Sequence, residues 1–177
     1  MRFVRPASIL LPLLLLAAIT CEAQGVVVQG KNVYGVRSGD QAMEAAIDRA
    51  RATLDIFNRY VERAARDGLD PRLKAAFRQG DRVEHMWVGG LTFDGRVYRG
   101  TLRNRPVDVT NVRLGDQVVI PPARVSDWSV VVDGALLGNF TTLVIHGRLT
   151  PKQRAQLERE VGARIVSDTA LLTPPQP

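Results

Sequence analysis

The clearest pattern in the chain is a stripe of apolar residues at steps of three and four between residues 40 and 68. Its members are Met43, Ile47, Ala50, Leu54, Phe57, Val61 and Ala64. This period places them on one face of a single long helix. Asp55 and Glu62 each precede an arginine by four residues on the opposite face, which favours a solvated helix surface. Gly68 predicts the end of the helix.

From about residue 73 the apolar period shortens to two, which is typical of β-strands. Strands are expected at residues 82–88, 91–93, 96–102, 107–109, 112–114, 118–120, 127–132, 135–138 and 140–146. Two Asp-Gly pairs, at 94–95 and 133–134, are typical of tight hairpin turns. Short strands at this spacing favour a bent antiparallel sheet or a small barrel.

A short helix is expected near the end of the chain. Thr150 is a good N-cap, Pro151 suits the first helical position, and Gln153 completes a capping box. We therefore expect an α+β fold. A long N-terminal helix packs on a bent antiparallel sheet or small barrel, and a short C-terminal helix follows.

Residues 1–23 have the pattern of a secretory signal peptide, with a basic start, an apolar run and a small-residue site that ends at Ala23. The apolar run is well short of the ~20 residues that a membrane-spanning helix needs. We expect the mature protein to be periplasmic or secreted. Cys21 leaves a second possibility open, in which this cysteine is lipidated and anchors the protein.

The remaining chain divides into three parts. Residues 24–39 are rich in Gly and Val and are expected to form a flexible arm or an extra strand. Residues 40–162 form a single α+β domain, because no linker or internal repeat interrupts them. Residues 163–177 end in a proline-rich stretch and are expected to be a C-terminal tail.

Composition narrows the class of function. The formal net charge is +6, and nearly all the basic charge is arginine, which does not exchange protons near neutral pH. This excess indicates either binding or the codon usage of an arginine-favouring genome, and not catalysis. Cys21 is the only cysteine, so the mature domain has no disulfide or thiol nucleophile. No cofactor motif is present, and export makes nucleic acid an unexpected partner.

The stretch "FRQGDRVEHMWVGGLTFDGRVYRGTLRNRPVDVTNVRLGDQVVIPPARVSDWSVVVDGALLGNFT" contains several motifs in a fixed order. They occupy Gly80–Asp81, Glu84–Trp87, Gly100–Pro106, Leu114–Pro121 and Ser126–Trp128. Together they resemble the bacterial domain of unknown function found in YegJ-like proteins, over about residues 40–148. The resemblance implies no established activity or cofactor. In some of these proteins the domain lies beside ankyrin repeats, which implies a role in protein contacts.

Glu84 and His85 are the side chains that most suggest catalysis. Adjacent side chains on a strand point to opposite faces, so the two cannot act on one substrate atom. Alternation puts His85 and Trp87 on one face and Glu84 and Met86 on the other. A structural or binding role is therefore favoured. With only His85 and His146 as histidines, no metal motif is formed.

Trp87 and Trp128 are the only tryptophans, and each suits either the core or a partner contact. Asp127, in a Ser-Asp-Trp motif, is expected to accept backbone N–H groups. Arg99, Arg103 and Arg105 share one parity along an expected strand. They form either a basic strip for an anionic partner or a solvated face paired with Asp94 and Asp108.

We therefore expect an exported, non-enzymatic binding module of the bacterial envelope, for which an inhibitor or immunity role is an analogy with other small exported domains. Its partner would be an acidic protein or another anionic envelope component. The expected binding residues are Glu84, His85, Trp87, Arg99, Arg103, Arg105, Asp127 and Trp128. Two alternatives stay open: a small hydrolase that uses Glu84, His85 and Asp127, and a lipidated structural component of the envelope.

Overall fold

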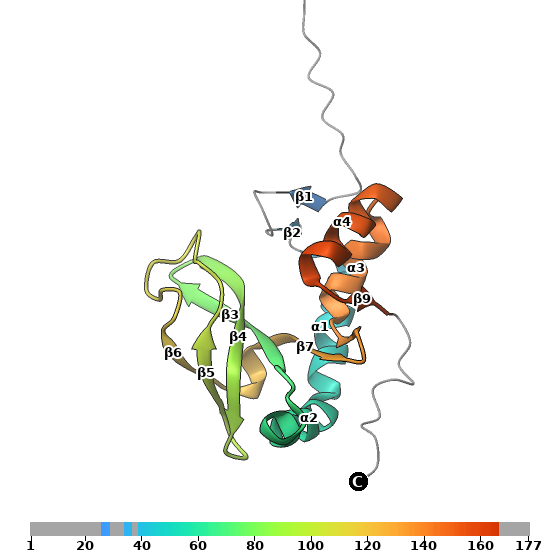
Figure 1. The fold of residues 1–177 in the computed structure, drawn as a ribbon. Helices are drawn as coiled ribbons and strands as arrows, with labels where there is room; N and C mark the ends of the chain where they lie inside the picture. Colours follow the sequence, from blue (N-terminus) through green and yellow to red (C-terminus); the bar gives the residue numbers. More distant parts are fainter. Residues whose placement is uncertain (1–25, 29–33, 37–38, 167–177) are drawn as a thin grey trace, which may run out of the picture.

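The computed structural model describes residues 26–28, 34–36 and 39–166. The expected signal peptide, Cys21 and residues 167–177 of the expected tail lie outside the described residues. The main sheet has seven strands in the order β6-β5-β4-β3-β7-β8-β9 (Figure 1). They are β3 (Arg72–Gln79), β4 (Arg82–Phe93), β5 (Tyr98–Leu102), β6 (Gln117–Ile120), β7 (Val125–Val132), β8 (Ala135–Gly138) and β9 (Arg164–Ile165). In the expected arm, β1 (Val26–Val28) pairs with β2 (Tyr34–Val36).

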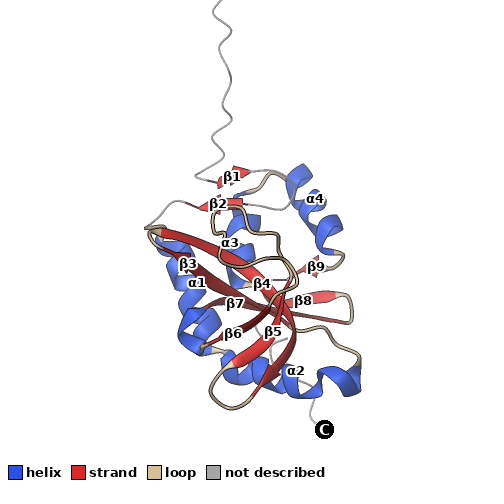
Figure 2. Cartoon of the chain, turned by 90° about the vertical axis from the view of Figure 1, so that its left-hand side faces the viewer, coloured by secondary structure: helices blue, strands red, loops and turns tan. Residues whose placement is uncertain are grey.

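Four α-helices pack around this sheet. They are α1 (Gln41–Ala52), α2 (Leu54–Asp67), α3 (Phe140–Arg148) and α4 (Pro151–Val161), and a 3₁₀ turn, η1, covers Pro122–Arg124. Helix α1 contacts β7 and α3, whereas α2 contacts β4 and β7. Figure 2 shows α2 below the strands of the sheet. The fold class is therefore α+β, as expected.

The sheet is open and mixed, which differs from the expected antiparallel sheet or small barrel. Five of its neighbouring pairs are antiparallel in the described chain, but β8 and β9 are parallel. Strands β6 and β9 form the two edges. Register shifts occur in β4 between Gly89 and Thr92, and in β3 between Lys74 and Ala75. Such irregularities bend a sheet without closing it.

The apolar stripe of the N-terminal helix faces the sheet, but it belongs to two helices and not to one. Thr53 separates α1 from α2 with φ −113° and ψ 17°. Its hydroxyl donates to the carbonyl of Arg49 at 2.9 Å and accepts from Nε1 of Trp128 at 2.9 Å. A threonine hydroxyl bonded to a preceding carbonyl competes with the helical ladder. Gly68 ends α2 in the left-handed conformation, as predicted.

The expected strand at residues 140–146 is wrong, because this segment forms α3. Its β-branched residues favour a strand locally. A carboxylate from a distant strand decides otherwise: Asp127 of β7 accepts from the backbone N–H groups of Phe140 and Thr141 at 3.0 and 2.9 Å. These are donors that a helix start leaves unsatisfied. Asn139, at φ 60°, turns the chain into the helix.

The expected strands at residues 107–109 and 112–114 are also wrong, since both lie in the loop between β5 and β6. The carboxylate of Glu84 accepts from the N–H groups of Val107, Asp108 and Val109 at 2.9 to 3.3 Å. The side chain of Gln79 accepts from Thr110 N at 2.7 Å. Side chains thus satisfy the backbone groups that a neighbouring strand would otherwise bind.

Of the two expected tight hairpins, one is confirmed. Asp133 and Gly134 alone join β7 to β8, with φ 49° and 71°, as a type I′ turn requires. The other is a longer loop, because β4 ends at Phe93 and β5 begins at Tyr98. There Asp94 accepts from two backbone N–H groups, those of residues 96 and 97, at 2.9 Å each.

Helix α4 begins with the predicted capping box of Thr150 and Gln153. It covers a smaller apolar cluster together with α3. The buried members are Leu136, Ile145, Leu149, Leu157, Ala163 and Ile165. Beyond residue 162, where the tail was expected to begin, the chain thus still contributes to the domain through β9.

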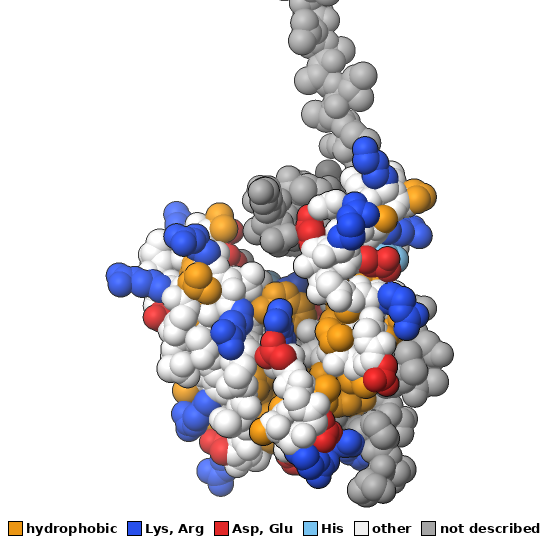
Figure 3. Space-filling model, viewed as in Figure 1, with side chains coloured by type: hydrophobic (Ala, Val, Ile, Leu, Met, Phe, Trp, Pro, Cys, Tyr) orange, Lys and Arg blue, Asp and Glu red, His pale blue; other side chains and the backbone are white. Residues whose placement is uncertain are grey.

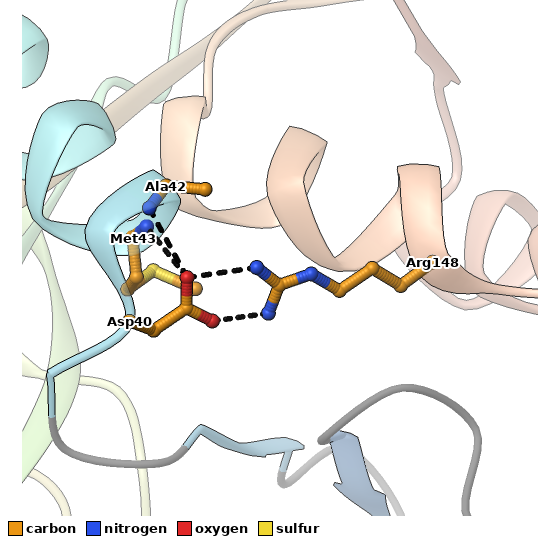
Figure 4. Close-up of polar contacts among 4 residues, drawn as sticks. All are labelled: Asp40, Ala42, Met43 and Arg148. Atoms are coloured by element: carbon orange, nitrogen blue, oxygen red, sulfur yellow. Dashed lines mark hydrogen bonds and ion pairs between the residues drawn. The ribbon is translucent and has the colours of Figure 1, made fainter.

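A bidentate ion pair joins the start of α1 to the end of α3 (Figure 4). Asp40 caps α1 by accepting from the N–H groups of Ala42 and Met43 at 3.1 and 3.3 Å. Both Nη atoms of Arg148 donate to the same carboxylate. The hydrogen bond from Arg148, more than any other contact, lowers the pKa of Asp40 from 3.8 to about 2.

This pair predicts a specific loss of stability in acid. Because the folded-state pKa of Asp40 is depressed, its stabilisation is present above pH 3.8 and is lost as the pH falls toward 2. The difference in unfolding free energy between the wild type and Asp40→Asn should therefore shrink across this window, as measured by urea unfolding. Asp48→Asn is the control, since within the described residues the Asp48 carboxylate forms a single, exposed ion pair, with Arg51 at 3.8 Å. A difference that does not change with pH would contradict this role.

Candidate functional site

The candidate site lies on the face of the sheet opposite the main core. In β4, Met86 and Val88 are fully buried, whereas His85 and Trp87 alternate onto the other face, as predicted. Register aligns Trp87 with Lys74 of β3, and Lys74 with Asp127 of β7. The N–H of Arg103 donates to the carbonyl of Trp87 at 2.8 Å. We call Asp127, Lys74, Trp87 and Arg103 the cross-strand row.

Lys74 lies at the centre of this row and was not singled out from the sequence. Its Nζ is 5.6 Å from the centroid of the Trp87 ring and 3.3 Å from the hydroxyl of Thr141 in α3. Burial lowers the pKa of Lys74, and the charge of Asp127 opposes this shift. The cation–π contact holds a half-buried tryptophan over a desolvated cation.

Asp127 is completely buried and acts as a cap for α3. Besides the two N–H donors at the start of α3, the Thr141 hydroxyl and the N–H of Trp128 donate to its carboxylate. Burial raises its pKa, whereas the charge of Lys74 and these hydrogen bonds lower it. Four donors and a helix N-terminus all favour the ionised form. The expectation that Asp127 accepts backbone N–H groups is confirmed.

Glu84 and His85 diverge, as the alternation predicts. The Glu84 carboxylate is occupied by the backbone of the loop after β5. On the other face, Nδ1 of His85 lies 2.8 Å from Oγ of Ser126, which in turn donates to the carbonyl of Lys74. The three residues of the hydrolase alternative, Glu84, His85 and Asp127, therefore have separate partners and do not converge.

The imidazole of His85 is neutral near neutral pH. Desolvation lowers its pKa to about 4, and the positive charges of Lys74, Arg78 and Arg51 add to the effect. His85 still has solvent-exposed surface. A neutral, exposed imidazole can offer a partner a hydrogen bond but adds no charge to this face.

Two expected binding residues need correction. Trp128 is fully buried on the core face, where it stacks on Phe57 at 5.2 Å and meets the edge of Phe140 at 5.7 Å. Asp127, its neighbour, points to the other face but lies under α3. Neither side chain can contact a partner directly, because both are sealed by helices.

The arginines of the expected strip remain on the surface. Arg99 lies 3.5 Å from Asp94, which is one of the pairs that the sequence suggests. The side chain of Arg103 lies along Gly89, where a Cβ atom would come 2.9 Å from its Nε. Arg105 is exposed. Among the described residues, no acidic side chain forms an ion pair with Arg103 or Arg105.

Comparison with known sequences follows this geometry. Residues 40–164 match a bacterial family described as "Uncharacterized protein conserved in bacteria (DUF2314)". The chain belongs to this family. The DUF2314 match runs from the cap of α1 into β9, and so includes the cross-strand row and α3, which covers Asp127.

Two relatives of this DUF2314 protein carry little functional information. The chain is 34% identical over 132 residues to a putative ankyrin repeat protein of Neisseria meningitidis serogroup B, covering 70% of this chain and 52% of that protein. It is 31% identical over 101 residues to the uncharacterized protein YegJ of Escherichia coli strain K12, covering 57% and 65%. The resemblance to YegJ-like proteins is thus confirmed. The matches span only about half to two thirds of these relatives, and no solved structure matches.

Two further observations concern only the described part of this DUF2314 chain. None of its helices is long and apolar enough to cross a membrane. No group of three or more His, Cys, Asp or Glu side chains is placed to hold a metal ion there.

Proposed function

We propose that this DUF2314 domain is a binding module of the bacterial envelope, which holds an acidic segment of a partner protein on the outer face of its sheet. The observation that supports this is a difference between the acidic and the basic side chains of this region. The carboxylates of Glu84 and Asp127 are occupied by backbone donors, whereas Arg103 and Arg105 stay exposed. The face therefore offers cations to a partner and has no free acid at the row.

The composition of the row suits binding. Tryptophan and arginine are the residues that most often dominate the energy of an interface. Lys74 packs against the ring of Trp87. The backbone of Trp87 is also held, because its N–H donates to the side-chain oxygen of Asn104 at 2.6 Å. A side chain that is already ordered loses little conformational entropy when a partner binds.

The charge distribution agrees with an acidic partner. Figure 3 shows Lys and Arg side chains on both halves of this view, over β3 to β6 and over the helices beside them, with Asp and Glu side chains among them. The formal net charge of the whole chain is +6. A field of one sign raises the rate at which an oppositely charged partner arrives.

An envelope location and a role in protein contacts are each supported by one further observation. The N-terminal pattern of residues 1–23 supports secretion, which brings the domain into contact with other exported proteins. One relative is named a putative ankyrin repeat protein. A domain that lies in the same protein as such repeats fits a role in protein contacts, including an inhibitor or immunity role.

A charge-reversal experiment tests the proposal. The variant Arg99→Glu/Arg103→Glu/Arg105→Glu should bind a decaglutamate peptide at least about tenfold more weakly than the wild type in titration calorimetry at low salt. The control Arg59→Glu/Lys152→Glu/Arg159→Glu changes the net charge equally at exposed positions outside the row. Equal weakening in both variants would show that only net charge matters and would overturn the proposed face.

A further inference from the structure

The bent sheet leaves a gap between the end of β3 and strand β6. Pairing of β3 with β7 stops at Ala75, so within the described chain residues 76–79 have no strand on that side. Among the strands that the structure describes, β6 pairs with β5 alone. A groove joins the two, with Phe77 and Arg78 on one wall and Val118 and Val119 on the other. We call it the seam groove; it lies where a closed barrel would have paired these strands.

The backbone groups along the two edges of the seam groove differ in whether side chains cover them. On β3, the carbonyl of Ala76 accepts from Nε of Arg124 at 2.9 Å, and the carbonyl of Arg78 accepts from Nδ2 of Asn111 at 3.0 Å. Residues two apart on a strand direct their carbonyls to the same side. Side chains therefore cover the β3 edge in place of a neighbouring strand.

The β6 edge has no such cover in the described structure. Leu102 N donates to Asp116 O at 2.9 Å, which fixes the ladder between β5 and β6. Hydrogen-bonded pairs alternate in an antiparallel ladder, so the backbone groups of Gln117 and Val119 point to the free edge. Val119 is 47% exposed. An uncovered strand edge is a template for pairing with another chain.

The lining of the seam groove indicates what kind of segment it fits. Phe77, Val112, Val118 and Val119 supply an apolar floor and rim. Arg78 is exposed, and Arg124 lies against the Phe77 ring, 5.2 Å from its centroid. The lining contains no acidic side chain. Aliphatic side chains suit the floor, and carboxylates suit the two guanidinium groups.

We propose that β6 binds an extended segment of a partner protein by strand addition, with alternate aliphatic side chains in the seam groove and acidic side chains toward Arg78 and Arg124. Main-chain hydrogen bonds to Gln117 and Val119 supply affinity, and the groove supplies selectivity. This surface is distinct from the cross-strand row, and the inference goes beyond the binding face proposed above.

The probe is a blocked hexapeptide of alternating Val and Glu. Val119→Pro removes an N–H that points to the free edge, and proline is tolerated at such an edge position. It should weaken binding at least about tenfold in titration calorimetry, as should N-methylation of alternate peptide amides. Val119→Thr keeps the N–H and should bind within about twofold of the wild type. Arg78→Glu should weaken binding more than the matched surface change Arg59→Glu.

Several outcomes would overturn the proposal. Equal affinity for the N-methylated peptide would do so even if Val119→Pro failed to fold, which thermal melting checks. Amide shifts of the bound protein confined to the cross-strand row, with none in residues 117–120, would place the peptide on the other face. Self-association of the protein in sedimentation, abolished by Val119→Pro and unaffected by the peptide, would make a second copy the occupant. The Arg99/Arg103/Arg105 variant tests only the binding face proposed above. If that variant kept its affinity for decaglutamate, the test of the seam groove would be unchanged.

Discussion

Replacing Asp127 by asparagine is expected to lower the free energy of unfolding by about 3 kcal/mol, a magnitude typical of breaking a buried charge pair. The substitution keeps the size of the side chain but removes the charge that faces Lys74 and the start of α3. All four hydrogen bonds at the Asp127 carboxylate are donated to it. The NH₂ group of the new asparagine can only donate, so it would face groups that also donate. A buried lysine would lose its counter-charge at the same time. Urea unfolding at neutral pH measures the change.

Asp133→Asn is the matched control for this prediction. Asp133 is exposed in the turn between β7 and β8 at φ 49°, a conformation that asparagine adopts as readily. Its change in unfolding free energy should be below about 0.5 kcal/mol. If Asp127→Asn proved equally mild, Asp127 would be uncharged in the folded protein, and its role as the ionic cap of α3 would be wrong.

The same carboxylate shows where local sequence patterns fail. The 140–146 segment is rich in β-branched residues, and nothing next to it marks a helix start except Asn139. The cap comes from Asp127, a residue on another strand, so a pattern confined to neighbouring residues cannot find it. The loop after β5 has the same explanation. Its apolar pattern predicts a strand at residues 107–109, but the backbone amides there donate to the carboxylate of Glu84, which lies on a distant strand.

The elements predicted correctly are those whose cause is local. Thr150 and Gln153 cap α4, Gly68 ends α2, and Asp133-Gly134 forms its turn, since each depends only on adjacent residues. The opening of the sheet is not local. It depends on side chains such as Arg124, which covers the β3 edge. The alternation of apolar and polar residues along a strand does not predict such a contact.

The candidate site was predictable in part for the same reason. Alternation along β4 correctly separates Glu84 from His85 and places Trp87 on the outer face. Lys74 was missed because its partners, Trp87, Asp127 and Thr141, come from three separate elements. A lysine among so many arginines, with Leu73 and Ala75 beside it, is the signal that could have drawn attention to it.

Replacing Gly138 by alanine is expected to be at least as damaging as the loss of Asp127, at about 3 kcal/mol or more. Gly138 has φ 73°, and a Cβ atom there would lie 2.5 and 2.7 Å from Cε3 and Cζ3 of Trp128. The indole cannot retreat, because it stacks on Phe57 and its Nε1 donates to Thr53. The carbonyl of Trp128 is also held, at 2.7 Å, by the N–H of Asn139.

Gly134→Ala separates this steric conflict from backbone strain. Gly134 has nearly the same φ, 71°, but a Cβ atom there meets nothing within 4 Å. It should cost only the left-handed strain of about 1 kcal/mol. The excess destabilisation of Gly138→Ala, read from paired urea titrations, then measures how rigidly Trp128 is held. The indole of Trp128 packs between α2 and its own strand β7, which also carries Asp127. A rigid indole therefore also keeps the cap of α3 and the cross-strand row in place. Equal losses in the two glycine variants would mean that the core yields around Trp128 and does not fix the row.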